Sequence, residues 1–236
     1  WSGFRTYKWL YGRKQDSMTT GGLQRFEMVY LNRAVAGGLQ IFNPESIENC
    51  KTGDHSIGVI PPKSYLVAGL DPAATGYQAA VLWAVTLEPF SMVLVDIDNQ
   101  HGGGIDQALR VIKEWKDRYD LYHWVIEENN FQKAIRQDQR IKEYCNVQGI
   151  ILEGHETYKN KWDPQFGVTA MANLFDDGKI VLPYANPESQ TKVDQYKKQL
   201  IYFASKGQQK AKTVSDIVMA SWFPMKVIRR ISKTSY

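Results

Sequence analysis

The chain has 236 residues, a formal net charge of +4 and 43% hydrophobic residues. This composition supports one large domain with a buried core and excludes a chain that is disordered throughout. No apolar run reaches the roughly 18 residues of a membrane-spanning helix, and the first residues form no signal peptide. We therefore expect a cytosolic protein without a membrane anchor. The absence of an initiator methionine leads us to expect a piece of a longer chain.

The cysteines and the charge pattern narrow the class further. Cys50 and Cys145 stand alone, without neighbouring metal-ligand residues, so neither a disulfide framework nor a zinc site is expected. The mild positive charge permits nucleic-acid binding without requiring it. Lysines gather late in the chain, between residues 192 and 212, where a solvated face and direct phosphate contact are equally good explanations.

The first part of the chain, residues 1–62, differs from the rest. It contains a short predicted helix at 26–32 and a helix start at Asn43-Pro44, with Asn43 as the cap. A polar segment follows and ends at Pro61-Pro62. We interpret residues 1–62 as a linker or the end of a preceding domain, and we place the main domain at residues 63–236.

From Tyr65 the pattern changes to strands. Three strands with short connections favour antiparallel hairpins. A helix with regularly spaced apolar residues comes next, and strands and helices then alternate. The predicted strands are 65–71, 77–87, 91–98, 121–130, 147–152 and 179–182, and the predicted helices are 105–118, 131–144, 164–175, 186–203 and 213–223.

This order of elements predicts the fold. A fourth strand that arrives through a helical crossover runs parallel to a strand of the same sheet. We therefore predict an α/β fold of the ribonuclease H-like type, with three antiparallel strands followed by parallel strands and with flanking helices. If the fourth strand lies beside the first, Asp71 and Glu127 end at the same edge of the sheet.

Three carboxylates are the candidate catalytic residues: Asp71 ends the first strand, Glu127 ends the fourth, and Asp216 lies in the last helix. Such a set can hold two Mg²⁺ or Mn²⁺ ions, which activate water and stabilise the leaving oxygen in phosphodiester cleavage. Each residue also has a structural explanation. Asp71 can start a turn, Glu127 can belong to a solvated loop with a helix cap, and Asp216 fits a capping box.

Other side chains could lie around this site. Asp98 on the third strand could face it, although polarity at a sheet edge explains Asp98 equally well. Lys161 could contact phosphate, although a solvated lysine is the alternative. The loop before the last helix is suited to grip the DNA backbone, through Lys206, Lys210 and Lys212. The Gly-rich loop at 101–104 lacks the following Lys-Ser/Thr of a P-loop and is interpreted as a turn.

Residues 63–236 resemble the nuclease domain of the large terminase subunit of tailed bacteriophages, the motor that packages and cuts concatemeric DNA. The resemblance rests on three motifs in order and on a lysine motif followed by a short helix, glycine and strand. These segments are 69–73 (GLDPA), 125–130 (VIEENN), 214–220 (VSDIVMA), 160–164 (NKWDP) and 175–180 (FDDGKI).

The resemblance implies two-metal endonucleolytic cleavage of DNA. It makes Asp71 the bridging ligand and favours Glu127 over Glu128, which faces the opposite side of an extended strand. It assigns Asp216 to the last catalytic position. Many relatives carry a second acid just before that position, and Ser215 stands there instead, which implies weaker binding of one ion.

The resemblance also implies partners. No Walker A motif occurs, so the ATPase half of a terminase is missing and residues 1–62 are expected to follow it. The expected partners are double-stranded DNA, the ATPase domain of the same full-length chain, the small terminase subunit and the portal. The expected location is the cytoplasm of the infected host, transiently at the procapsid portal. The alternatives are another ribonuclease H-like DNA enzyme (integrase, transposase or resolvase) and a non-catalytic DNA-gripping module.

Overall fold

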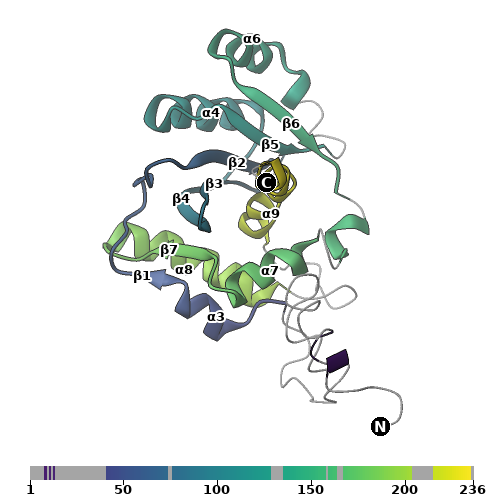
Figure 1. Cartoon of the computed structure of the whole chain (residues 1–236). Coiled ribbons are helices and arrows are strands. Elements are labelled where there is room, and N and C mark those ends of the chain that lie inside the picture. The colour runs from purple at the N-terminus through teal and green to yellow at the C-terminus, as the bar shows by residue number, and fades with distance from the viewer. Residues whose placement is uncertain are drawn as a thin grey trace.

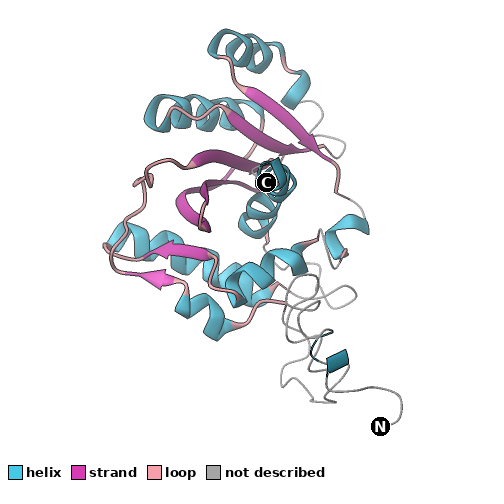
Figure 2. Cartoon of the chain, in the orientation of Figure 1, coloured by secondary structure: helices cyan, strands magenta, loops and turns pink. Residues whose placement is uncertain are grey.

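The structure is a computed structural model that describes residues 8–9, 11, 13, 41–73, 76–128, 135–157, 159–163, 167–203 and 215–234. The predicted helix at 26–32 lies outside these residues. Within them, strands form a seven-stranded sheet in the order β1-β7-β4-β3-β2-β5-β6. Helices cover both faces of this sheet (Figures 1 and 2).

The bounds of β2 and β3 agree with the strands predicted from the sequence. The strands are β1 (Lys51–Thr52), β2 (Tyr65–Asp71), β3 (Tyr77–Leu87), β4 (Phe90–His101), β5 (His123–Glu127), β6 (Ile151–His155) and β7 (Ile180–Pro183). The helices are α3 (Pro44–Asn49), α4 (Ile105–Tyr119), α6 (Gln139–Gln148), η1 (Lys159–Trp162), α7 (Val168–Asp176), α8 (Pro187–Tyr202), α9 (Asp216–Trp222) and α10 (Met225–Thr234).

The sheet is mixed, as predicted. Strand β3 pairs antiparallel with both β2 and β4, whereas β5 runs parallel to both β2 and β6. Strand β7, reached after the parallel pair, joins β4 in parallel. The predicted α/β class, with antiparallel strands followed by parallel ones and flanking helices, is confirmed.

Alternation along the strands divides the apolar side chains between two cores. Val67, Trp83 and Val125 belong to a core that includes residues of α7, α8, α9 and α10, which we call the α9-side core. Ala68, Leu82 and Trp124 belong to the α4-side core, beneath α4 and α6. Successive residues of a strand point to opposite faces, so a residue's face can be read from its neighbours.

Residues 41–60 pack into the sheet. Asn43 caps α3, accepting a hydrogen bond from the Glu45 backbone N–H at 3.0 Å. Phe42 and Ile47 are fully buried in the α9-side core, and the Phe42 ring meets Phe175 edge-on at 5.6 Å between centroids. Strand β1 then pairs in parallel with β7. The packed core of the described residues therefore begins before the Pro61-Pro62 punctuation.

Two elements differ from the prediction. The predicted strand at 147–152 lies at 151–155, because α6 continues to Gln148 and ends at Gly149 with a φ of +68°. The last predicted helix, at 213–223, corresponds to α9, and a further helix that was not predicted, α10, follows after Pro224. Pro224 lies directly before α10, and its backbone carbonyl accepts a hydrogen bond from the Ile228 N–H at 3.0 Å.

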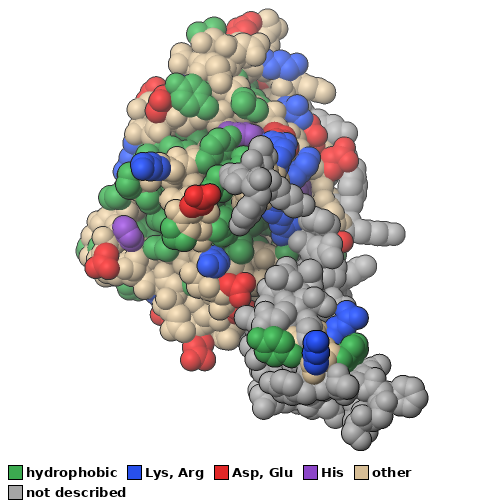
Figure 3. Space-filling model, in the orientation of Figure 1, with side chains coloured by type: hydrophobic (Ala, Val, Ile, Leu, Met, Phe, Trp, Pro, Cys, Tyr) green, Lys and Arg blue, Asp and Glu red, His purple; other side chains and the backbone are tan. Residues whose placement is uncertain are grey.

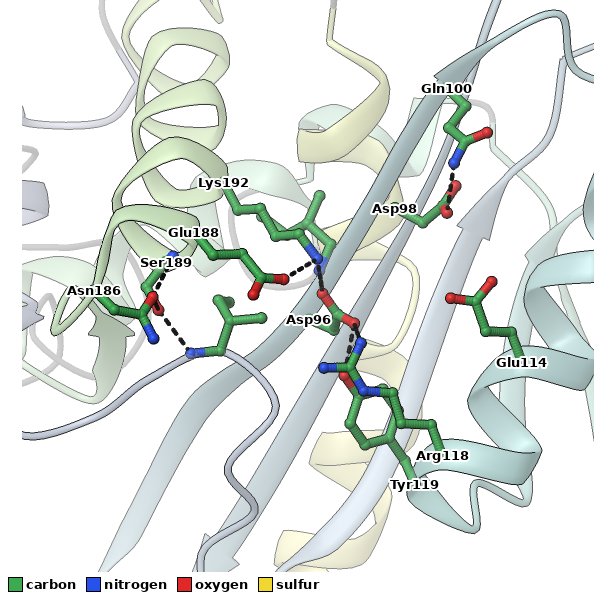
Figure 4. A network of polar contacts seen from close by, with 12 residues as sticks. Asp96, Asp98, Gln100, Glu114, Arg118, Tyr119, Asn186, Glu188, Ser189 and Lys192 are labelled. Atoms are coloured by element: carbon green, nitrogen blue, oxygen red, sulfur yellow. Dashed lines mark hydrogen bonds and ion pairs between the residues drawn. The ribbon is translucent and has the colours of Figure 1, made fainter.

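A buried carboxylate ties the two helical layers together at β4. Asp96 is 3% exposed and accepts hydrogen bonds from the Tyr119 hydroxyl of α4 at 2.6 Å and from the Lys192 ammonium of α8 at 2.5 Å (Figure 4). Arg118 approaches the same carboxylate at 3.7 Å. This network compensates the burial of a charge with direct partners.

None of the helices in the described part of the chain combines the length and the apolar character that crossing a bilayer requires.

Candidate active site at the end of strands β2 and β5

The register of two parallel strands brings Asp71 and Glu127 together. Leu70 of β2 lies beside Ile126 of β5, and the two carboxylic acids are the next residues on their strands. Both point to the α9 side of the sheet, because Val67 and Val125, which lie an even number of residues before them, belong to the α9-side core.

A glycine lets α9 approach this edge. A Cβ atom on Gly69 would lie 1.9 Å from the Ala220 carbonyl oxygen and 2.7 Å from Cδ of Pro224. The backbone of α9 therefore rests directly on β2, two residues before Asp71. Asp216 is the first residue of α9, about 6 Å along the helix from Ala220. The short helix thus delivers a third carboxylate from a separate element.

The three carboxyl groups influence one another electrostatically. The pKa of Asp71 is raised well above its ordinary value, first by burial and then by the charges of Glu127 and Asp216 and by a hydrogen bond with Glu127. Burial also raises the pKa of Asp216, while its own backbone N–H opposes that rise. Crowded carboxyl groups of this kind favour a shared proton or a bound cation.

Lys161 is the cation next to this group. Burial lowers the pKa of its ammonium group, and the charges of Asp71 and Glu127 oppose that fall. The ammonium lies 5.2 Å from the ring centroid of Trp162 and 5.0 Å from that of Phe203. The structure therefore brings Lys161 to the carboxylates, on the 3₁₀ turn η1.

Glu128 lies on the other side of the sheet. It forms an ion pair with Arg136 and occupies the space above Gly154, where a Cβ would meet its Cδ at 2.0 Å. Gly154 lies beside Ile126, a residue of the α4-side core. The sheet thus separates Glu128 from Asp71.

Asp98 is also on the α4 side. It lies beside Ala80 in the register of β3 and β4, and it pairs with Arg110 of α4 at 2.6 Å. The structure therefore does not bring Asp98 to Asp71. The reason is an irregularity in β4, where the register shifts between Leu82 and Trp83 and one extra residue reverses the alternation.

The remaining candidate site residues are Ser215 and three lysines. Ser215 is the half-buried residue at the N-cap of α9 and makes no side-chain capping hydrogen bond. Lys206, Lys210 and Lys212 lie outside the described residues. Lysine and arginine side chains gather around the C-terminal helix α10 (Figure 3), where Lys226 and Arg230 expose 62% and 56% of their side chains.

Sequence reasoning missed two polar residues in the same row of the sheet. His155 of β6 lies beside Glu127, and Asn99 of β4 lies beside Ala79, which in turn lies beside Asp71. The strand register is needed to see this row. The predicted strand at 147–152 begins four residues before β6, so it stops short of His155.

The donor set fits a hard divalent cation, because carboxylate oxygens are the ligands that Mg²⁺ and Mn²⁺ prefer. A cation held by Asp71 and Glu127 would take the place of the hydrogen bond between them. In the residues that the structure describes, no three His, Cys, Asp or Glu side chains are arranged as a metal site. The residue types of the three carboxylates nevertheless fit the ion.

No family model matches the chain, and no curated protein matches its sequence. Among solved structures, the magnesium-bound large terminase nuclease of thermophilic phage G20c has a TM-score of 0.55 at 12% identity, over 82% of this chain and 98% of that one. The chain has the fold of a phage large terminase nuclease domain.

Two further structures agree with this terminase nuclease fold. The P22 large terminase nuclease domain gives a TM-score of 0.52 at 15% identity, over 80% of this chain and 97% of that one. The HK97 large terminase gives 0.54 at 12% identity and covers 96% of this chain. This chain spans about half of the HK97 protein, 52% of its length.

Proposed function

We propose that this chain is the metal-dependent endonuclease domain of a viral DNA-packaging terminase, which cuts concatemeric double-stranded DNA. The observation that carries the proposal is the adjacency of Asp71 and Glu127 on parallel strands, with α9 seated on Gly69 beside them. The terminase nuclease fold supports it, as do the magnesium and cobalt in two G20c terminase nuclease structures of this fold.

In this proposal the carboxylates divide the work of holding two cations. Asp71, on β2, would hold both ions, and Glu127 and Asp216 would each hold one of them. Bound Mg²⁺ or Mn²⁺ would supply an activated water and stabilise charge on the leaving oxygen. Lys161 places a positive charge beside Asp71 and Glu127, where it can contact the scissile phosphate.

The proposed partners follow from the proposed role as a terminase nuclease. The nuclease would include α3 and β1 together with residues 63–236, because both elements pack into the same sheet and core, and the residues before α3 would follow an ATPase domain in the full-length chain. The small terminase subunit and the portal are the other proposed partners, in the cytoplasm of the infected host and transiently at the procapsid. Basic side chains around α10, with Lys206, Lys210 and Lys212, are proposed to contact the DNA backbone.

The test is Mn²⁺-dependent nicking of supercoiled plasmid. Asp71→Asn and Glu127→Gln are each expected to abolish nicking and to weaken Mn²⁺ binding in calorimetric titration. Glu128→Gln, a matched change on the other side of the sheet, is expected to retain both, and EDTA is expected to stop the parent. Nicking by Asp71→Asn at the parent rate would refute the assignment. Strand transfer or selective cutting of four-way junctions would favour a different ribonuclease H-like enzyme.

A further inference from the structure

His155 lies next to the proposed catalytic glutamate. It ends β6 and is the register partner of Glu127 on β5. Its ring lies on the α9 side, edge-on to Trp222 at 4.5 Å between centroids and tilted against Phe223 at 5.1 Å. Neighbouring strands are about 4.8 Å apart. The imidazole and the Glu127 carboxylate therefore leave adjacent strands on the same face.

The two ring nitrogens of His155 are buried without a hydrogen-bond partner among the residues that the structure describes. The residue is 7% exposed, and neither Nδ1 nor Nε2 has a hydrogen-bond partner within the described part of the chain. Leaving a buried donor unpaired is costly. Among the aromatic rings of α9, a phenylalanine would fill the same space without that cost. A packing role alone therefore does not explain a histidine here.

His123 provides an internal comparison. It is also buried and lies on the same face, at the opposite end of β5 from Glu127. Its Nδ1 lies 2.6 Å from the Tyr65 hydroxyl, so this histidine has a structural hydrogen bond. Of these two buried histidines, only His155 has both ring nitrogens without a hydrogen-bond partner among the described residues.

Glu127 is the nearby group that a cation would affect. It is hydrogen-bonded to Asp71. A cation held by both carboxylates would take the place of this hydrogen bond, and a Glu127 oxygen could then accept from a donor on the neighbouring strand β6, where His155 is its register partner. Carboxylate ligands are themselves usually held by an outer hydrogen bond, which fixes their orientation.

We infer that His155 is a positioning residue, whose ring N–H donates a hydrogen bond to the Glu127 carboxylate when a divalent cation occupies the site. His155 acts through Glu127 and does not bind the ion. The inference rests on the proposed function, because it requires Glu127 to be a cation ligand.

The test is calorimetric titration of the whole chain with Mn²⁺, alongside thermal unfolding without metal. His155→Phe keeps the ring and removes the N–H, so Mn²⁺ affinity is expected to fall by about 10–100-fold. Its melting temperature is expected to stay the same or to rise, because an unpartnered polar group is removed. His155→Gln keeps an N–H donor and is expected to recover part of the affinity. His123→Phe is the matched control, with affinity unchanged.

The outcomes separate this inference from the proposed function. Parent-like Mn²⁺ affinity in His155→Phe overturns the inference while the nuclease assignment stands. Equal losses in the Phe and Gln variants also overturn it, because the N–H then has no role. If His155→Phe does not fold, His155→Leu supplies the variant without an N–H, and the same comparison applies. A parent chain that binds no Mn²⁺ refutes the proposed function and this inference with it.

Discussion

Gly69→Ala tests whether the close packing of α9 against β2 is needed to position Asp216 near Asp71 and Glu127. The added Cβ would lie 1.9 Å from the Ala220 carbonyl oxygen, whereas real Cβ contacts essentially never fall below 3.0 Å. The helix must therefore move away from the strand by at least about 1 Å, since both partners are main chain and cannot rotate aside. Asp216, one turn from Ala220, moves with the helix.

Two magnitudes follow from that displacement. Overpacking of this kind costs about 1–3 kcal/mol, which corresponds to a fall in melting temperature of about 2–12 °C for a domain of this size. A shift of about 1 Å in a reacting group lowers activity by about 100-fold. We therefore expect a folded protein that has lost most of its Mn²⁺-dependent nicking and part of its Mn²⁺ affinity.

Scanning calorimetry, plasmid nicking and Mn²⁺ titration measure these effects. Gly53→Ala is the matched control, because a Cβ there meets nothing within 4 Å. It is expected to melt and nick like the parent. The reasoning is refuted if Gly69→Ala has the melting temperature and the nicking rate of the parent, because α9 would then not rest on β2 through this glycine.

Two further predictions concern stability. Asp96→Asn leaves the Lys192 ammonium without its buried carboxylate and is expected to lower the free energy of unfolding by about 3 kcal/mol. Asp98→Asn, which affects a more exposed pair, is expected to cost less than about 1 kcal/mol by urea denaturation. Burial lowers the pKa of His155 to about 4, below its ordinary value of about 6.5. The unfolded ring therefore binds a proton first, and stability falls as the pH drops from about 6.5 to 4. The parent should lose about 2 kcal/mol more than His155→Phe between pH 7 and pH 4.5, and parallel pH curves would contradict this.

The centre of the fold could be predicted because its signals are local. The strands β2 and β3 have the predicted bounds, since apolar runs bounded by Pro72 and Glu88-Pro89 leave little freedom. A topological rule, that a helical crossover leads to a parallel strand of the same sheet, made it possible to expect Asp71 and Glu127 at one edge if β5 lies beside β2. The structure supplies that condition, because β5 pairs with β2.

The parts that could not be predicted depend on register. Asp98 would share the face of Met92 and Leu94, and hence of Asp71, if β4 alternated regularly. The extra residue at Val95 reverses that alternation, and no sequence signal marks it. His155 was missed for a related reason, because Val147 has the residue type of a strand but lies 81% exposed at the end of α6.

The pairing of β1 with β7 has a practical consequence for shortened forms of the protein. A chain that starts at residue 63 lacks β1, so the outer backbone groups of β7 lose their partners. It also lacks Phe42 and Ile47, which opens the core against α7. An unpaired strand edge next to exposed apolar side chains invites association between molecules. Such a chain is expected to precipitate, whereas one that starts at residue 41 keeps β7 paired with β1 and keeps the core covered.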